Sequence, residues 1–149
     1  MGLSLPEPPA ALASYVPVRS VPLAAGRSLL HVSGQVPLDG GRPIHRGAVP
    51  DQVTIEQAQE AARLCALNIL AQVEAAAGLG RVEQVVQLTG FVLSSAGFGQ
   101  QPLVVNAASD LLVQVLGEAG RHSRIAVGTS ALPLDCPVEI AAVVQVGSG

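Results

Sequence analysis

The chain has 149 residues, of which 49% are hydrophobic and 13% charged, whereas soluble domains average about 25% charged residues. This length favours one domain, residues 1–149, with a substantial core. All eight basic residues are arginine, and the absence of lysine excludes a Schiff-base lysine and a P-loop phosphate site.

The composition also bears on whether the protein contacts a membrane, is secreted or binds nucleic acid. No run approaches the about 18 consecutive apolar residues of a spanning helix, so no membrane contact is expected. Residues 1–13 carry three prolines and no basic region; we expect an extended segment there, no signal peptide and a soluble, cytoplasmic protein. A net charge of −3 with only three aromatic residues counts against nucleic-acid binding.

Periodicity and turn residues predict seven elements. A capping box at 54–57 precedes apolar residues spaced three or four apart, with Gly78 as the stop. Pro102 marks the first turn of a second helix and Gly120 follows its end. The predicted elements are strands at 16–23 and 28–33, a helix at 55–76, a strand at 84–93, a helix at 102–118, and strands at 124–131 and 138–146.

The order β-β-α-β-α-β-β predicts an α+β fold of two layers, with two helices on one face of a single mixed sheet. The other face would then be bare. Both sides of the strand at 138–146 are largely apolar, and two helices can cover only one side of a sheet. We therefore expect the second face to be buried against other copies of the chain.

Two charged residues lie in apolar strands, where each needs a partner to offset lost solvation: Arg124 and Glu139. A regular hairpin around residues 132–137 would place both on one face, about 20 Å apart at about 3.3 Å per residue. That register opposes an ion pair within the chain without excluding it. The two residues could otherwise form one site from different subunits, or have separate roles.

Other candidate sites carry weak signals. Cys65 and Cys136 are far apart and lack the spacing of zinc ligands, so we expect reduced cysteines and no metal. None of the three histidines, His122 among them, lies in a nucleophile or metal motif. No cofactor fingerprint is identified, because Gly78-Leu-Gly80 follows a helix instead of a strand and Gly40-Gly41 after Asp39 is an ordinary turn.

Short motifs spread over nearly the whole chain resemble the Rid (reactive-intermediate deaminase) family, also called YjgF-like or L-PSP endoribonuclease-like. Their order is characteristic of that family. The matching residues are Tyr15-Val16, Val32-Ser33-Gly34-Gln35-Val36-Pro37, Gln57, Asn106, Arg124, Leu132-Pro133 and Val138-Glu139-Ile140.

The resemblance implies a chorismate-mutase-like fold and a homotrimer whose sheets line a central barrel, with ligand clefts between subunits. It also implies that Arg124 clamps the carboxylate of a 2-imino acid and that Glu139 positions and activates the hydrolytic water. The remaining matches, Tyr15, Ser33, Gly34 and Asn106, would border the substrate pocket. Such a hydrolysis needs neither a metal nor a cofactor, because the imine carbon is already electrophilic.

The arginine motif departs from the family pattern. Deaminases of the family usually have Pro-Ala-Arg-Ser there, whereas this chain has His122-Ser123-Arg124-Ile125, which indicates a divergent branch. Three functions follow: hydrolysis of reactive imines and enamines to 2-oxo acids and ammonia, binding of small carboxylates without catalysis, and endoribonuclease activity. The charge balance favours the small-molecule functions over the ribonuclease.

Overall fold

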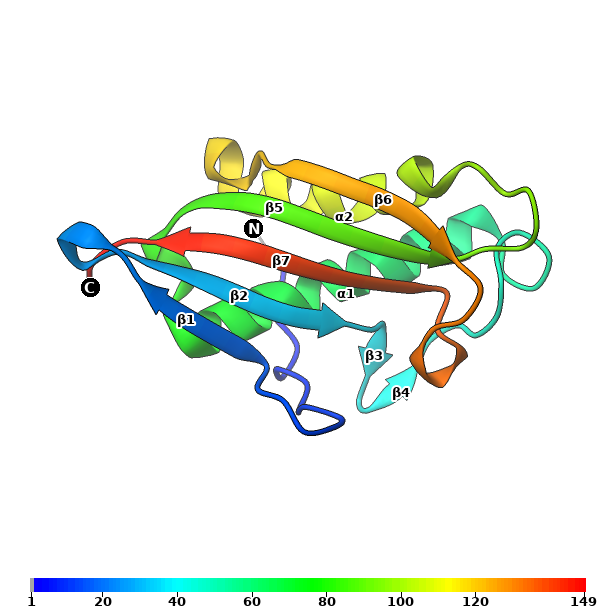
Figure 1. Cartoon of the computed structure of the whole chain (residues 1–149), viewed down its shortest axis with the longest axis horizontal. Helices are drawn as coiled ribbons and strands as arrows, with labels where there is room; N and C mark the ends of the chain where they lie inside the picture. Colours follow the sequence, from blue (N-terminus) through cyan, green and yellow to red (C-terminus); the bar gives the residue numbers. More distant parts are fainter. Residues whose placement is uncertain (1) are drawn as a thin grey trace.

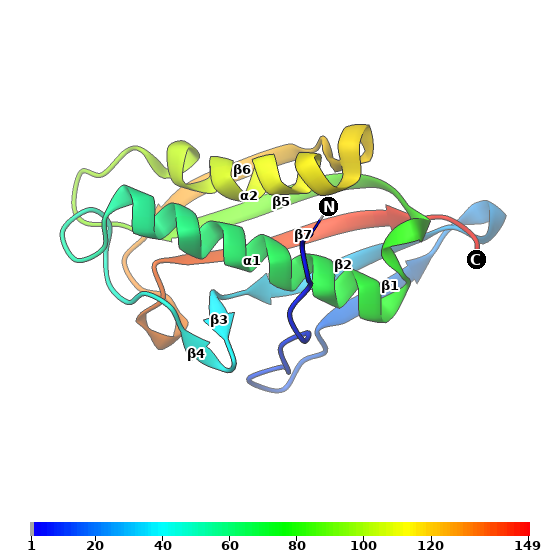
Figure 2. The ribbon, with the colours of Figure 1, turned by 180° about the vertical axis from the view of Figure 1, so that it is seen from behind.

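The computed structural model describes residues 2–149, which form a five-stranded sheet with two helices on one face (Figures 1 and 2). The predicted two-layer α+β fold is therefore confirmed. The main strands are β1 (Val18–Pro22), β2 (Ser28–Gln35), β5 (Val82–Leu93), β6 (Ser123–Thr129) and β7 (Val138–Val146), and the helices are α1 (Ile55–Ala76) and α2 (Gln101–Leu116). A small ribbon, β3 (Leu38–Asp39) and β4 (Arg42–Pro43), follows β2.

The strand order is β1-β2-β7-β5-β6, with β5 and β6 parallel and the other pairs antiparallel. The predicted hairpin between residues 124–131 and 138–146 is wrong, because β5 lies between β6 and β7. Helix α2 links β5 to β6, and a helical crossover returns the chain parallel to the strand it left. The proline-containing loop then carries the chain past β5 to β7.

This order places the two charged candidates on opposite faces of the sheet. Arg124 pairs with Leu88, which is fully buried beneath the helices. Glu139 pairs with Phe91, which is 36% exposed on the helix-free face. Since paired residues point to the same face and successive residues alternate, the predicted shared face for Arg124 and Glu139 is wrong.

Helix α1 begins and ends as its sequence predicts. The Thr54 hydroxyl accepts a hydrogen bond from the Gln57 backbone N–H (3.1 Å), and the Gln57 side chain accepts one from the Thr54 N–H (3.0 Å). At the other end Gly78 adopts a positive φ of 86°, which glycine tolerates best. Its N–H donates to the carbonyls of Val73 and Glu74, so the last turn is closed by backbone bonds.

Helix α2 packs on α1 and the sheet (Figure 2). It ends at Leu116, two residues before the predicted boundary, where Gly117 begins a 3₁₀ turn, η3 (Gly117–Gly120). By length and composition alone, Gln101–Gly120 is a helix that could cross a membrane. One face of the helix is buried against the protein, as in an amphipathic helix that packs on a core, whereas Leu103 and Val113 on it are exposed. The buried residues are Val104, Val105, Ala108, Leu111 and Leu112.

The helix-free face of the sheet remains apolar and uncovered by the chain itself. Ile125 is 48% exposed, Val127 41% and Phe91 36%, and all three lie on this face because their strand partners do. On β7 the residues facing the helices are buried, whereas those on the other side are half-buried. This face is a candidate for contact with other copies of the chain.

Replacing Thr54 by alanine tests the capping box. We expect Thr54→Ala to lower the free energy of unfolding by about 1 kcal/mol, because the Gln57 N–H loses its acceptor. Thr54→Ser, which keeps the hydroxyl, should stay within a few tenths of a kcal/mol of the parent. Urea denaturation at one protein concentration measures both, and equal losses in the two variants would contradict the assignment.

Candidate functional site

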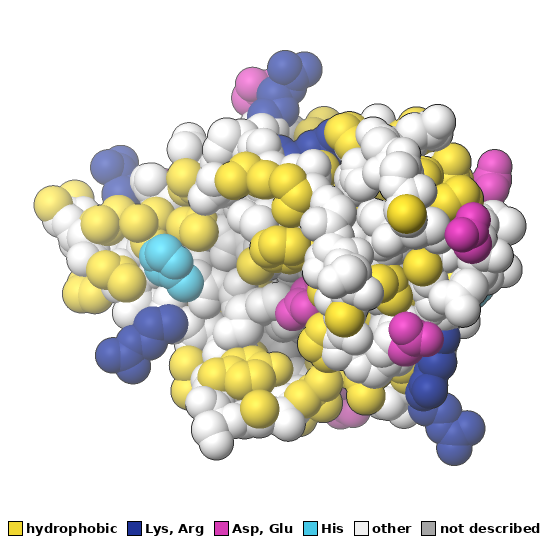
Figure 3. Space-filling view, turned by 45° about the vertical axis from the view of Figure 1, so that its right-hand side comes forward, with side chains coloured by type: hydrophobic (Ala, Val, Ile, Leu, Met, Phe, Trp, Pro, Cys, Tyr) yellow, Lys and Arg dark blue, Asp and Glu magenta, His cyan; other side chains and the backbone are white. Residues whose placement is uncertain are grey.

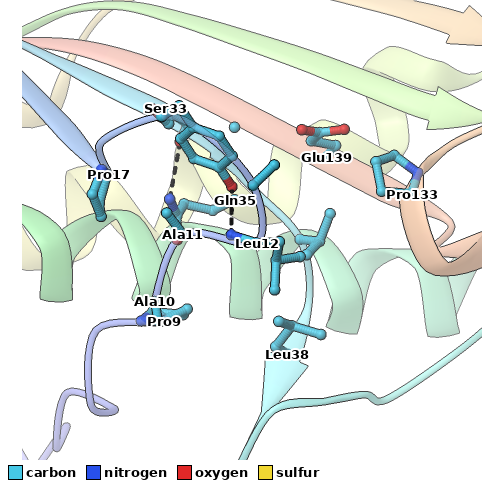
Figure 4. Close-up of a pocket in the computed structure, with 14 residues that line it drawn as sticks. Pro9, Ala10, Ala11, Leu12, Pro17, Ser33, Gln35, Leu38, Pro133 and Glu139 are labelled. Atoms are coloured by element: carbon cyan, nitrogen blue, oxygen red, sulfur yellow. Dashed lines mark hydrogen bonds between the residues drawn. The ribbon is translucent and has the colours of Figure 1, made fainter.

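A pocket of about 440 Å³ opens between the N-terminal segment, the end of β2 and the start of β7. Most of its lining is apolar and comes from residues 9–17, together with Val36, Leu38 and Pro133. Figure 3 shows hydrophobic side chains around a hollow in this side of the molecule, and Figure 4 shows Glu139 and Pro133 facing Ser33 across the pocket. Tyr15, Ser33, Gly34 and Glu139, four of the predicted site residues, all line it.

A β-bulge at Ser33 and Gly34 shapes one wall. The pairing passes from Val32 opposite Ala142 to Gln35 opposite Ile140, so β2 contains one residue more than β7 across this stretch. A bulge bends the strand and changes where its side chains point. The Ser33 hydroxyl donates to the Val16 carbonyl (2.7 Å) and the Ser33 N–H to the Pro17 carbonyl (2.9 Å). These bonds hold the N-terminal segment against the pocket.

Gly34 makes room for the carboxylate of Glu139. A Cβ at position 34 would overlap the Glu139 Oε1 atom, so only glycine lets the carboxylate lie directly against β2. Within residues 2–149 no group donates a hydrogen bond to this carboxylate, and partial burial raises the pKa of Glu139 above its ordinary value. An unpaired, partly desolvated carboxylate is available to hold a water and accept its proton.

Tyr15 folds the chain back over the pocket. Its hydroxyl oxygen accepts a hydrogen bond from the Leu12 N–H (3.2 Å), and its side chain lines the pocket while the residue remains 46% exposed. The structure thus gives Tyr15 a contact within the N-terminal segment as well as a place at the pocket mouth.

Arg124 lies elsewhere, against α2, in a second open groove of about 690 Å³. Its Nη1 donates to Asn106 Oδ1 (2.9 Å) and to Ser109 Oγ (3.1 Å), and its Nη2 donates to the Pro102 carbonyl (3.2 Å). The structure therefore brings together two predicted site residues, Arg124 and Asn106, with α2 supplying all three acceptors.

The predicted site residues thus form two separate groups within one chain. Tyr15, Ser33, Gly34 and Glu139 line the first pocket, whereas Arg124 and Asn106 meet on the helix-covered side of the sheet. The ion pairs found in residues 2–149 are Arg27–Glu83, His45–Glu60 and Arg121–Glu118. Arg124 and Glu139 do not pair within the chain.

The structure adds two residues to which the sequence gave no role, Ser109 and His122. Ser109 Oγ lies 2.9 Å from His122 Nε2, and His122 Nδ1 lies 2.6 Å from the Gly120 carbonyl oxygen. The position of Ser109 three residues after Asn106 places both on one helix face, which is the one sequence signal that could have found it. No pattern pairs His122 with Ser109, because their contact depends on how β6 packs against α2.

The part of the chain that the structure describes, residues 2–149, contains no group of three or more His, Cys, Asp or Glu residues arranged to hold a metal ion. Cys65 and Cys136 are both buried free thiols. Burial raises the pKa of Cys136 to about 11, so its thiol is neutral at neutral pH and is no ready metal ligand.

Known proteins resemble this chain over nearly its whole length. The family described as "YjgF/chorismate mutase-like, putative endoribonuclease" matches residues 1–144. Protein TCP17 of Trypanosoma cruzi is 41% identical over 150 residues, which cover 99% of this chain and 91% of that protein.

Solved structures also resemble this chain over nearly its whole length. The Agrobacterium tumefaciens protein Atu1372, of unknown function, is 44% identical with a TM-score of 0.85, over 97% of this chain and 86% of that one. E. coli TdcF, solved with bound serine, is 26% identical with a TM-score of 0.64, over 94% and 93% of the two chains. The family match over residues 1–144 and the 41% identity to Protein TCP17 show that the chain belongs to the YjgF/chorismate mutase-like family.

Proposed function

We propose that this protein hydrolyses reactive 2-imino acids, and their enamine tautomers, to 2-oxo acids and ammonia in clefts between the subunits of a homotrimer. The observation that carries the proposal is the set of donors left on Arg124. A guanidinium has five N–H donors, and three are already used by α2. The two that remain, on Nε and Nη2, sit on neighbouring nitrogens and fit the two oxygens of a carboxylate.

Glu139 supplies the base in this proposal. Its carboxylate accepts a proton from water as the water oxygen attacks the imine carbon, and the resulting amino alcohol collapses to the 2-oxo acid as the nitrogen leaves as ammonia. Glu139 passes the first proton to the imine nitrogen, which gives the amino alcohol, and then moves the hydroxyl proton of the amino alcohol to the same nitrogen as the C–N bond breaks and the C=O bond forms. Both protons of the water leave in ammonia, so water and imine are the only reactants. The apolar lining of the pocket suits a substrate whose side chain is uncharged.

A second copy of the chain is needed to bring Arg124 and Glu139 to one substrate, because they lie on opposite faces of the sheet in one subunit. β6 is an edge strand, so Arg124 lies at the margin of the subunit, where a neighbour can approach. The exposed apolar residues Phe91, Ile125 and Val127 support burial of the helix-free face in a trimeric barrel. The serine bound by E. coli TdcF has an α-carboxylate, the group that Arg124 is proposed to bind in a 2-imino acid.

Substitution of Arg124 tests the carboxylate clamp. We expect Arg124→Ala and Arg124→Lys to lower kcat/KM for 2-iminobutanoate by at least about 100-fold, because a lost pair of charge-assisted bonds costs on the order of 3 kcal/mol. Arg42→Ala is the matched control, because Arg42 is an exposed arginine on β4 that lines neither the pocket of Glu139 nor the groove of Arg124. The assay measures ammonia release from imines generated in situ by an amino-acid oxidase.

Two results would replace the proposal. Binding of 2-oxobutanoate that depends on Arg124, without turnover of the imine, would indicate a carboxylate-binding module that is not an enzyme. Salt-dependent RNA cleavage lost in both Arg121→Ala and Arg124→Ala would favour the endoribonuclease, since backbone neutralisation uses every nearby cation.

Activity should depend on pH through Glu139. Only the carboxylate form accepts a proton, so kcat/KM falls as the pH drops through the pKa of Glu139, which burial raises. The acid limb should therefore lie above about 4.3, the ordinary pKa of glutamate. Glu139→Gln should lose this limb together with most of the activity, whereas Glu56→Gln, an exposed residue on α1, should keep both. An acid limb unchanged in the small residual rate of Glu139→Gln would assign it to another group.

Replacing Gly34 tests whether the position of the Glu139 carboxylate affects activity independently of the stability of the fold. In Gly34→Ala the new Cβ displaces the end of a flexible side chain, the Glu139 carboxylate, so we expect about a tenfold or greater loss of kcat with a small change in Tm. Gly80→Ala is the control, because a Cβ there meets no atom within 4 Å. Kinetics and thermal denaturation are measured on both variants, and full activity in Gly34→Ala would show that the position of Glu139 is unimportant.

A further inference from the structure

We propose that Ser109 and His122 are positioning residues that orient the guanidinium of Arg124 for the substrate carboxylate. This inference rests on the proposed function, because it assigns Arg124 the role of carboxylate clamp. Neither residue touches the reacting atoms in this arrangement. Both act through Arg124, by way of a hydrogen-bond chain that begins at the turn after α2 and ends at Nη1.

The direction of each bond in this chain follows from the chemistry of its ends. The Gly120 carbonyl can only accept, so His122 Nδ1 carries a proton. In the neutral imidazole Nε2 is then an acceptor, and it receives the proton of the Ser109 hydroxyl. Ser109 Oγ in turn accepts from Arg124 Nη1. Each donor along this hydrogen-bond chain, namely Arg124 Nη1, the Ser109 hydroxyl and His122 Nδ1, meets an acceptor, and a satisfied network of this kind holds one geometry.

The first bond of the hydrogen-bond chain, from His122 Nδ1 to the Gly120 carbonyl, starts from a fixed backbone. Gly120 is buried, and a Cβ at this position would overlap the backbone carbonyl of Leu112 in α2. The turn therefore packs directly on the helix backbone, which fixes the carbonyl that holds His122. Ser109 is on the same helix, so α2 anchors both ends of the relay and the guanidinium cannot rotate without breaking it.

The relay determines which donors of Arg124 stay available. With Asn106 and Ser109 both on Nη1, that nitrogen has no hydrogen left for a ligand. The substrate carboxylate must then bind at Nε and Nη2, in a single orientation. Removing Ser109 frees one of the two Nη1 hydrogens, and removing His122 leaves the Ser109 hydroxyl without the partner that orients it. Either change lets the guanidinium adopt other orientations, which weakens carboxylate binding without removing the charge.

A nucleophilic role for Ser109 fits the structure less well, although a serine beside an imidazole is also the arrangement of an activated nucleophile. The Arg124 guanidinium donates to the same oxygen, so one of the two hydroxyl lone pairs is engaged by a cation and the oxygen is a weaker nucleophile. The geometry therefore favours a serine that transmits orientation over one that forms a covalent intermediate.

The experiment measures binding and turnover separately in the intact oligomer. Binding of 2-oxobutanoate by isothermal titration calorimetry gives Kd, and the coupled imine assay gives KM and kcat. We expect Ser109→Ala and His122→Ala each to raise Kd and KM about tenfold with kcat within about twofold, because the clamp is misaligned while Glu139 is untouched. Ser20→Ala, an exposed serine on β1, is the control.

Two further variants distinguish orientation from general loss of structure. The double variant Ser109→Ala, His122→Ala should bind no more weakly than Ser109→Ala alone, because both substitutions break the same chain. His122→Gln, whose amide oxygen can replace Nε2 as acceptor, should recover most of the lost affinity. Additive effects, or a fall in kcat with KM and Kd unchanged, would overturn the inference.

Arg124→Ala separates this inference from the proposed function. If Arg124→Ala leaves the Kd of 2-oxobutanoate unchanged, the clamp itself is wrong and the proposed function fails with it. If Arg124→Ala abolishes binding while Ser109→Ala and His122→Ala bind like the parent protein, the clamp stands and the positioning role is overturned.

Discussion

The alternation of side chains along β6 and β7, on either side of β5, is the constraint on which the rest of the structure depends. Because successive residues point to opposite faces, the position of each strand decides which of its residues enter the core. β7 buries one set of apolar residues beneath the helices and leaves Glu139 on the other face. β6 does the reverse with its charge, placing Arg124 against α2 and Ile125 and Val127 in the open. A single chain therefore places its candidate base, Glu139, and its candidate carboxylate-binding cation, Arg124, on opposite faces of the sheet.

The two charges are treated very differently by their surroundings. Arg124 has three acceptors from one helix, so its cost of desolvation is offset locally. Within residues 2–149 no group donates a hydrogen bond to the Glu139 carboxylate, and partial burial raises the pKa of Glu139. A cation held in place by three bonds, with two donors left, suits binding of an anion, whereas a carboxylate without a hydrogen-bond donor suits proton transfer. The asymmetry matches the division of labour that an imine hydrolysis requires.

Local irregularities in the backbone occur where these charges are placed. The bulge at Ser33 and Gly34 brings the β2 backbone close enough to receive the Glu139 carboxylate, and ties the N-terminal segment across the pocket. The tight turn at Gly120 holds Arg124 in place through the hydrogen bonds of His122 and Ser109. In both places a glycine allows a close approach that any larger residue would block, so the precision of each site originates in the backbone.

The sequence by itself determined the element types, the capping of α1, the two-layer architecture and, through its motif order, the family. These depend on local propensity and periodicity, which a linear pattern carries. Only the tertiary structure decided that β5 separates β6 from β7, that Arg124 and Glu139 face opposite sides, and that Ser109 and His122 contact Arg124. Strand order and side-chain contacts across α2 and β6 depend on how distant segments pack, and a crossover or a hairpin can join the same two strands without changing the pattern along either one.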